Sequence, residues 1–90
     1  MATLDTVKTA LRINHSELDS EITRLISAAS ADMIRAGVAP EIVQTGGQLV
    51  TQATVTYCLM NMTEESVLID KYARAYEIQV DGIRRATNVQ

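Results

Sequence analysis

The longest stretch without a charged side chain runs from residue 42 to residue 63, in a chain where 21% of the residues are charged. Inside it, apolar residues recur at spacings of three and four, as in a helix that packs one face against a core. These residues are Leu49, Val50, Ala53, Tyr57 and Met60. The other positions carry Gln, Thr, Cys and Asn, so even the back of this helix is expected to be partly covered. The pattern predicts a central core helix over residues 48–62.

A β-strand is the alternative for part of this stretch. Residues 53–59 alternate between apolar and polar side chains, and Thr, Val and Tyr favour strands. Helix is favoured because the run is longer than an average strand and no other segment offers a pairing partner. A membrane span is not expected, since several glutamines and the Gly46–Gly47 pair interrupt the apolar positions.

Two short helical segments are predicted before the central helix. Thr3 is placed to cap a helix over residues 4–12, with an acidic residue in its first turn. Pro40 fits the first position of a short helical turn over residues 40–43.

Between them, the clearest amphipathic pattern predicts a helix over residues 16–36. Ser16 is placed to cap it, with Asp19 three residues later in the manner of a capping box, and Gly37 is placed to end it. The residues expected to face the core are Leu18, Ile22, Leu25, Ile26, Ala29 and Met33.

A last helix is predicted over residues 64–82, with Thr63 as its cap. Its apolar positions follow one another at spacings of three and four: Ile69, Tyr72, Tyr76, Val80 and Ile83. Gly82 weakens a helix, so fraying is expected there, with residues 86–90 as a mobile tail. Together the segments predict an all-α chain, a small bundle of about four helices that forms a single domain over residues 1–90.

Composition makes this core thin. The chain has no Phe or Trp, and Cys58 is its single cysteine, so no disulfide compensates for the small size. Oligomerisation is one ordinary way to stabilise such a domain. The net charge of −3 argues against a dedicated nucleic-acid binder. No basic segment followed by an apolar one lies near Met1, so we expect no signal peptide and a cytoplasmic location.

Catalytic chemistry finds no support in the sequence. His15 is the single histidine and has no nearby metal-ligand partner, and Cys58 lies in the predicted core, where it acts as a small hydrophobe. The Gly46–Gly47 pair lacks the lysine and further glycines of a phosphate-binding loop. We therefore expect no enzyme activity, no metal and no cofactor.

Three ordered motifs resemble the small helical head–tail connector proteins of tailed bacteriophages. The first is Thr3-Leu4-Asp5-Thr6-Val7-Lys8 through Leu11-Arg12-Ile13, followed by an acidic stretch. The second is the spacing of Val50, Ala53, Tyr57 and Asn61 in the central helix, and the third is Lys71-Tyr72 with Ala75-Tyr76-Glu77 in the last. The resemblance implies an adaptor that forms a homo-oligomeric ring under the portal protein. Such a ring joins the DNA-filled head to a head-completion or tail protein and lets double-stranded DNA pass. It implies a place at the head–tail junction of the virion, with assembly in the cytoplasm of the host bacterium.

For such an assembly, we expect two sets of functional residues. The candidate interface residues are Thr51, Thr54, Tyr76, Val80, Ile83 and Arg84. The candidate channel-facing acids are Glu17 and Glu21, which would repel DNA phosphates. The substitution Thr54→Glu is expected to disturb assembly while leaving the fold of one chain intact.

A small helical regulatory or nucleic-acid-binding domain is the alternative function. Two helices joined near residues 14–16 would suit a helix-turn-helix motif. The second of them, however, begins with the acids Glu17, Asp19 and Glu21, which repel phosphates.

Overall fold

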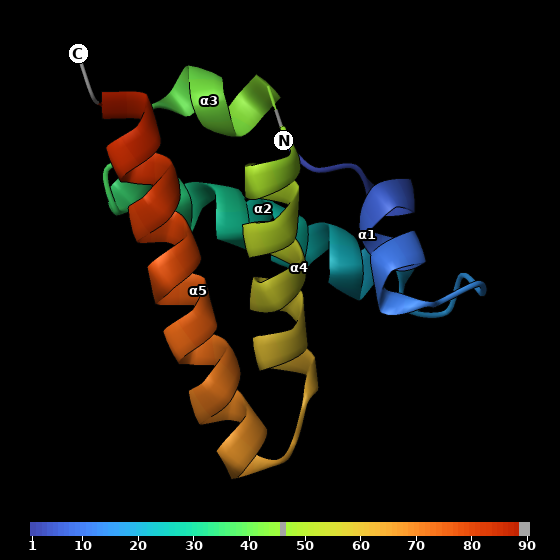
Figure 1. Ribbon diagram of the computed structural model, residues 1–90. Coiled ribbons are helices and arrows are strands. Elements are labelled where there is room, and N and C mark those ends of the chain that lie inside the picture. Colours follow the sequence, from blue (N-terminus) through green and yellow to red (C-terminus); the bar gives the residue numbers. More distant parts are fainter. Residues whose placement is uncertain (46, 89–90) are drawn as a thin grey trace.

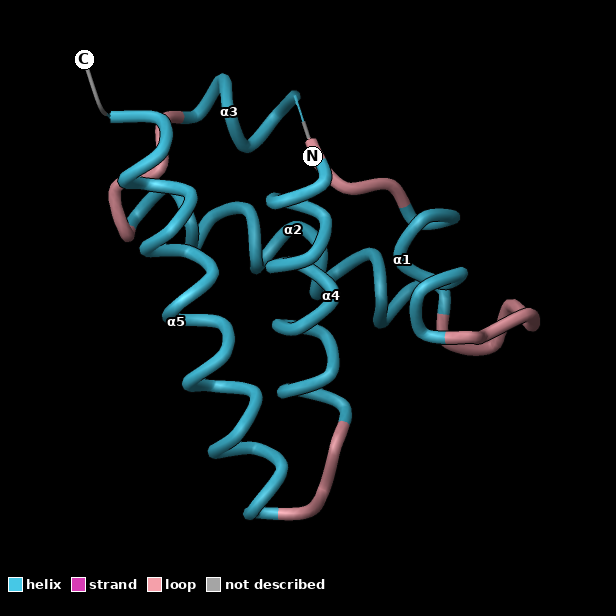
Figure 2. The backbone as a smooth tube through the Cα atoms, viewed as in Figure 1, coloured by secondary structure: helices cyan, strands magenta, loops and turns pink. Residues whose placement is uncertain are grey.

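A computed structural model describes residues 1–45 and 47–88 as five helices, and no strand occurs among these residues (Figures 1 and 2). The helices are α1 (Leu4–Leu11), α2 (Asp19–Arg35), α3 (Pro40–Thr45), α4 (Gln48–Met62) and α5 (Ser66–Asn88). The all-α prediction is confirmed, and the strand alternative for residues 53–59 is wrong. The principal extents of the chain are 43, 28 and 18 Å.

The α4 helix lies at the centre and has the predicted bounds. It contacts α5, α2 and α1. The α5 helix runs antiparallel to α4, and the two form a helical hairpin. Figure 1 shows α1 and α5 on opposite sides of α4, with α2 crossing behind α4. The hairpin extends beyond the other helices at the turn that joins α4 to α5.

The core consists of two clusters that meet at one side chain of α4. Tyr57 packs against both, and its ring lies 5.3 Å from that of Tyr76, centroid to centroid. One cluster joins the end of α2, α3, α4 and α5: Ala29, Met33, Val38, Val43, Val50, Ala53, Tyr76, Val80 and Ile83. The other joins the N-terminal segment, α1, the start of α2 and α4: Ala2, Val7, Ile22, Leu25, Ile26 and Cys58. With two small clusters in place of one large core, stability depends on each large side chain.

The ends of α1, α2 and α3 test the predicted caps. Thr3 caps α1 as predicted, because its hydroxyl accepts a hydrogen bond from the Thr6 N–H at 3.2 Å. Pro40 begins α3 as predicted, although this helix extends to Thr45. The predicted start of α2 at Ser16 is wrong: the helix begins at Asp19, and the residue before it gives no side-chain cap. Asp19 instead binds Lys8 of α1 at 2.7 Å, so a tertiary ion pair uses the carboxylate that was predicted for the cap.

The last helix is displaced from its predicted bounds at both ends. It begins at Ser66, while Thr63 ends α4 and accepts the Glu65 N–H through its hydroxyl at 3.3 Å. The predicted helix end at Gly82 is wrong, because α5 continues to Asn88. Asp81 pairs with Arg84 and Arg85, and these ion pairs join the turns on either side of the glycine. The expected mobile tail over residues 86–90 is helical up to residue 88, and residues 89–90 lie outside the described residues.

Candidate assembly surfaces

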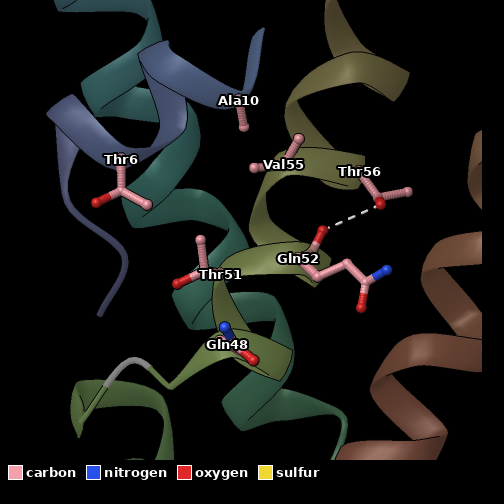
Figure 3. A pocket seen from close by; sticks show the side chains of 7 residues that line it. All are labelled: Thr6, Ala10, Gln48, Thr51, Gln52, Val55 and Thr56. Atoms are coloured by element: carbon pink, nitrogen blue, oxygen red, sulfur yellow. Dashed lines mark hydrogen bonds between the residues drawn. The ribbon is translucent and has the colours of Figure 1, made fainter.

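An open groove of about 670 Å³ separates α1 from α4. Figure 3 shows Thr6 and Ala10 of α1 facing Thr51 and Val55 of α4 across it. The lining residues, here called the α1–α4 groove, are Thr6, Ala10, Gln48, Thr51, Gln52, Val55 and Thr56. None of these side chains carries a charge, so the groove can receive an apolar ridge without desolvating an ion.

Several polar groups of this groove are already hydrogen-bonded within the chain. The Thr56 hydroxyl donates to the Gln52 carbonyl at 3.0 Å, as Figure 3 shows, and the Thr6 hydroxyl lies 2.7 Å from that of Thr3. A threonine whose hydroxyl bonds its own helix presents mainly its methyl group to a partner. The groove is therefore less polar than its sequence suggests.

A second exposed surface lies along the solvent side of α5. Val67 and Ile78 are 77% and 73% exposed, more than any other large apolar side chain of the described residues. They lie eleven residues apart, three turns along one face, and they line a shallow depression together with Asp70, Lys71, Arg74 and Ala75. We call Val67, Asp70, Lys71, Arg74, Ala75 and Ile78 the outer face of α5. It lies opposite the buried residues Tyr76 and Val80 of the same helix.

A polar clamp fixes α5 against the end of α2. The Tyr76 hydroxyl donates to the Asp32 carboxylate at 2.7 Å, and the Arg84 guanidinium donates to the Ala36 carbonyl at 2.9 Å. Burial, and then the hydrogen bond to Asp32, raise the pKa of Tyr76 above its ordinary value. The clamp holds the outer face of α5 in a fixed orientation relative to the rest of the chain.

The six candidate interface residues separate into two groups. Thr54, Val80 and Ile83 are buried, as is Tyr76, and they pack within the chain rather than on its surface. The expectation that Thr54 is half-covered is wrong: its exposed fraction is 0%, and its hydroxyl donates to the Val50 carbonyl at 2.8 Å. These four side chains are not available to a second copy in this conformation.

The other two candidates, Thr51 and Arg84, reach the surface. Thr51 is half-buried in the α1–α4 groove, and Arg84 is exposed at the clamp. An interface role for these two stays a prediction.

Comparison with known proteins adds one finding to this geometry. A family described as phage connector protein matches residues 3–79, which include four of the helices and more than half of α5. The chain belongs to the phage connector protein family. Comparisons with curated proteins and with solved structures returned no significant match.

In this connector, the two candidate channel-facing acids lie near the start of α2. Glu17 precedes the helix, in the connection from α1, and its side chain is 87% exposed. His15 lies beside it, with 3.9 Å between its Nδ1 and the Glu17 carboxylate. Glu21 is exposed in the first turn of α2. Both acids are at the surface, and the direction in which they face within an assembly stays a prediction.

Residues 1–45 and 47–88 contain no group of three His, Cys, Asp or Glu side chains arranged to hold a metal ion. No helix within these ranges is long and apolar enough to cross a membrane. Burial raises the pKa of the Cys58 thiol to about 11, which keeps it protonated and unreactive at neutral pH.

Val67 and Ile78, the most exposed large apolar residues within the described ranges, were not among the predicted site residues. A signal was present, because their spacing of eleven residues places them on one helix face, opposite Tyr76. The groove residues Thr6 and Ala10 gave no comparable signal, since they are small side chains at the surface of a short helix.

Proposed function

We propose that this chain is a structural protein of the head–tail junction in a tailed bacteriophage or prophage. Copies of it form a ring that binds the portal protein on one side and a head-completion or tail protein on the other. Double-stranded DNA passes through the ring during packaging and ejection. The observation that carries the proposal is the match of the connector family to residues 3–79.

The surface of the chain supports an assembly role. An uncharged groove and an exposed apolar helix face are features of protein–protein contact sites, and both occur in a chain of 90 residues with a divided core. No catalytic role is proposed, and none of the motifs suggests one.

Charge supports the passage of DNA without tight binding. The net charge is −3, and Glu17 and Glu21 are exposed carboxylates at one end of the molecule. In the proposed ring these acids line the channel, where they repel phosphates and reduce the number of cation contacts that would hold DNA. The protein acts at the head–tail junction of the virion. The virion is assembled in the cytoplasm of the host bacterium.

A regulatory or DNA-binding function has less support. The connection between α1 and α2 spans residues 12–18, longer than the three or four residues of a helix-turn-helix. The helix that would enter the major groove also begins with Asp19, Ser20 and Glu21, two of which are acidic.

Binding to the portal protein of the same genome tests the proposal. The purified chain is mixed with assembled portal, and the mass of the complex is measured by analytical ultracentrifugation or native mass spectrometry. We expect several copies to bind each portal, in a number related to the portal symmetry. A chain that leaves the portal unbound at every ratio contradicts the connector function.

The acids are tested in a second arm with the double variant Glu17→Lys and Glu21→Lys. Wild-type chain is expected to show no salt-dependent binding of duplex DNA. The double variant is expected to gain such binding, because two carboxylates in each copy become cations that can contact phosphates. Tight, salt-dependent binding of duplex DNA by the wild-type chain supports the alternative function.

A further inference from the structure

The outer face of α5 has the properties of a buried contact, although nothing in one chain covers it. Val67 and Ile78 are three-quarters exposed, and their separation of eleven residues corresponds to about 17 Å along the helix. Lys71 and Arg74 lie on the same face and take part in none of the ion pairs formed among the described residues. Asp70 lies on this face as well, so the face is an apolar ridge flanked by two cations and one carboxylate.

The α1–α4 groove has the complementary properties. Two helices with small side chains between them form the kind of furrow that receives the ridge of a third helix. Its lining is uncharged, so Val67 and Ile78 of another helix can enter without burying an unpaired ion. Ala10 is exposed and small, which leaves room for a branched apolar side chain.

Charge around the groove matches the cations of α5. Asp5 directly precedes the groove residue Thr6 on α1, and it is exposed and outside the ion pairs of the described residues. A symmetric contact between two α5 helices would instead use the same surface in both copies and form a closed dimer, which leaves both grooves empty and does not extend into a ring.

The two surfaces lie on opposite sides of the molecule. In Figure 1, α5 and α1 stand on either side of α4, so one copy can use its α5 face and its groove at the same time. A contact between two different surfaces repeats from copy to copy and closes into a ring when the rotation permits.

We propose that the outer face of α5 of one copy docks in the α1–α4 groove of the next copy. Val67 and Ile78 enter the groove, and Lys71 and Arg74 lie toward the Asp5 carboxylate of α1. This inference rests on the proposed function, since it names the contact that joins neighbouring subunits of the ring. A single helix in a groove buries less surface than a standard interface, so two isolated copies associate weakly and ring closure adds stability.

Two blocking variants of the full chain test this contact. Ile78→Asp places a charge on the α5 ridge, and Ala10→Arg fills the groove. Ile34→Asp is the matched control, because Ile34 is 41% exposed on α2 and belongs to neither surface. Self-association is measured by sedimentation equilibrium up to millimolar concentration, with circular dichroism to verify folding. Each blocking variant is expected to weaken association at least about tenfold, since burying an isoleucine contributes that much, and the control is expected to match the wild type.

Mixing the two blocking variants distinguishes a head-to-tail contact from a symmetric one. The pair has one intact α5 face, on the Ala10→Arg chain, and one intact groove, on the Ile78→Asp chain. An equimolar mixture is therefore expected to form a heterodimer and nothing larger. If either blocking variant does not fold, Val67→Asp or Gln52→Arg takes its place.

Three results overturn the inference: wild-type chain that stays monomeric up to millimolar concentration, blocking variants that associate like the wild type, or a mixture that forms no heterodimer. These outcomes are separate from the portal test. A chain that binds portal while its blocking variants assemble normally refutes the contact and leaves the connector function standing. Failure to bind portal refutes the function itself.

Discussion

Replacing Thr54 with glutamate is expected to unfold or severely destabilise the chain. Thr54 is fully buried in the middle of α4, and its hydroxyl is hydrogen-bonded to the Val50 carbonyl of the same helix. A glutamate there must bury a carboxylate without a partner and also needs more space than threonine occupies. This expectation reverses the one drawn from the sequence, in which the fold survives.

The size of the effect follows from the pKa that such a site imposes. Full burial raises the pKa of a carboxyl group by roughly 3 to 5 units, and each unit corresponds to about 1.4 kcal/mol. Because a folded-state pKa above 7 keeps the buried carboxyl group largely protonated at pH 7, the penalty at that pH is set by the roughly 2.7 units between the unfolded pKa of about 4.3 and pH 7, which is about 3 to 4 kcal/mol. Overpacking adds about 1 to 3 kcal/mol. A domain of this length has a free energy of unfolding of about 5 to 14 kcal/mol in total. The combined loss of about 4 to 7 kcal/mol is a large part of this total.

Urea denaturation followed by circular dichroism measures this loss, with Gln52→Glu as the control. Gln52 is exposed on the same helix, two residues away, and its replacement introduces the same side chain at the surface. We expect a change of at most about 0.5 kcal/mol in the free energy of unfolding for the control. A Thr54→Glu chain as stable as the control at neutral pH refutes the burial of this position.

The same substitution has a predictable pH dependence. Burial would raise the folded-state pKa of the carboxyl group that Thr54→Glu introduces. Its penalty therefore applies above the unfolded-state pKa of about 4.3 and shrinks as the pH falls toward that value. Urea denaturation at pH 5 and pH 7 is expected to show a smaller loss at the lower pH, and an equal loss would point to overpacking alone.

Three further predictions concern groups whose surroundings the structure defines. Tyr76→Phe removes the hydrogen bond to Asp32 and is expected to lower the free energy of unfolding by about 0.5 to 1.5 kcal/mol at neutral pH. Because the folded-state pKa of Tyr76 is raised, the stabilisation by this tyrosine is present below its unfolded pKa of about 10 and is lost as the pH rises further. Urea titrations of Tyr76→Phe should therefore show a smaller loss of stability at alkaline pH than those of the wild type, and equal losses would contradict this. Gly82→Ala is expected to raise the free energy of unfolding by about 0.5 to 1 kcal/mol, because nothing lies within 4 Å of the added methyl group. Gly37→Ala is expected to lower it by about 1 kcal/mol or more, because Gly37 has φ +108°. Thermal unfolding of both variants tests these signs, and a stabilised Gly37→Ala chain would contradict the second. Cys58 is fully buried and its pKa is raised to about 11, so a thiol reagent should label it in urea but not in the folded chain, and rapid labelling of folded protein would show that the site opens.

Local chemistry accounts for the elements that the sequence predicts well. The start of α4 follows from the glycine pair within the uncharged stretch and its end from the end of that stretch, and the start of α1 follows from the Thr3 cap. The start of α2 could not be predicted in this way, because Asp19 pairs with Lys8, a residue of another helix. The continuation of α5 past Gly82 depends on ion pairs of Asp81 that a propensity argument does not weigh.

The candidate surfaces were harder to predict than the helices. Thr54 suggested a surface because threonine is polar, but a hydroxyl that bonds its own helix lets threonine pack as an apolar residue. Val67 and Ile78 lie opposite Tyr76 and Val80, which the sequence already places on the apolar face of the last helix, so their exposure could have been predicted from helical spacing. The α1–α4 groove depends on how two helices far apart in the sequence are placed, which no local pattern contains.

Electron microscopy of the particles made without this chain tests its function most directly. The coding sequence is interrupted in the phage or inducible prophage that carries it, and lysates are compared with those of a strain that supplies the wild-type chain from a plasmid. We predict that heads and tails accumulate separately, and that the plasmid restores joined particles. Intact tailed particles in the absence of the chain would contradict its assignment as the connector between head and tail.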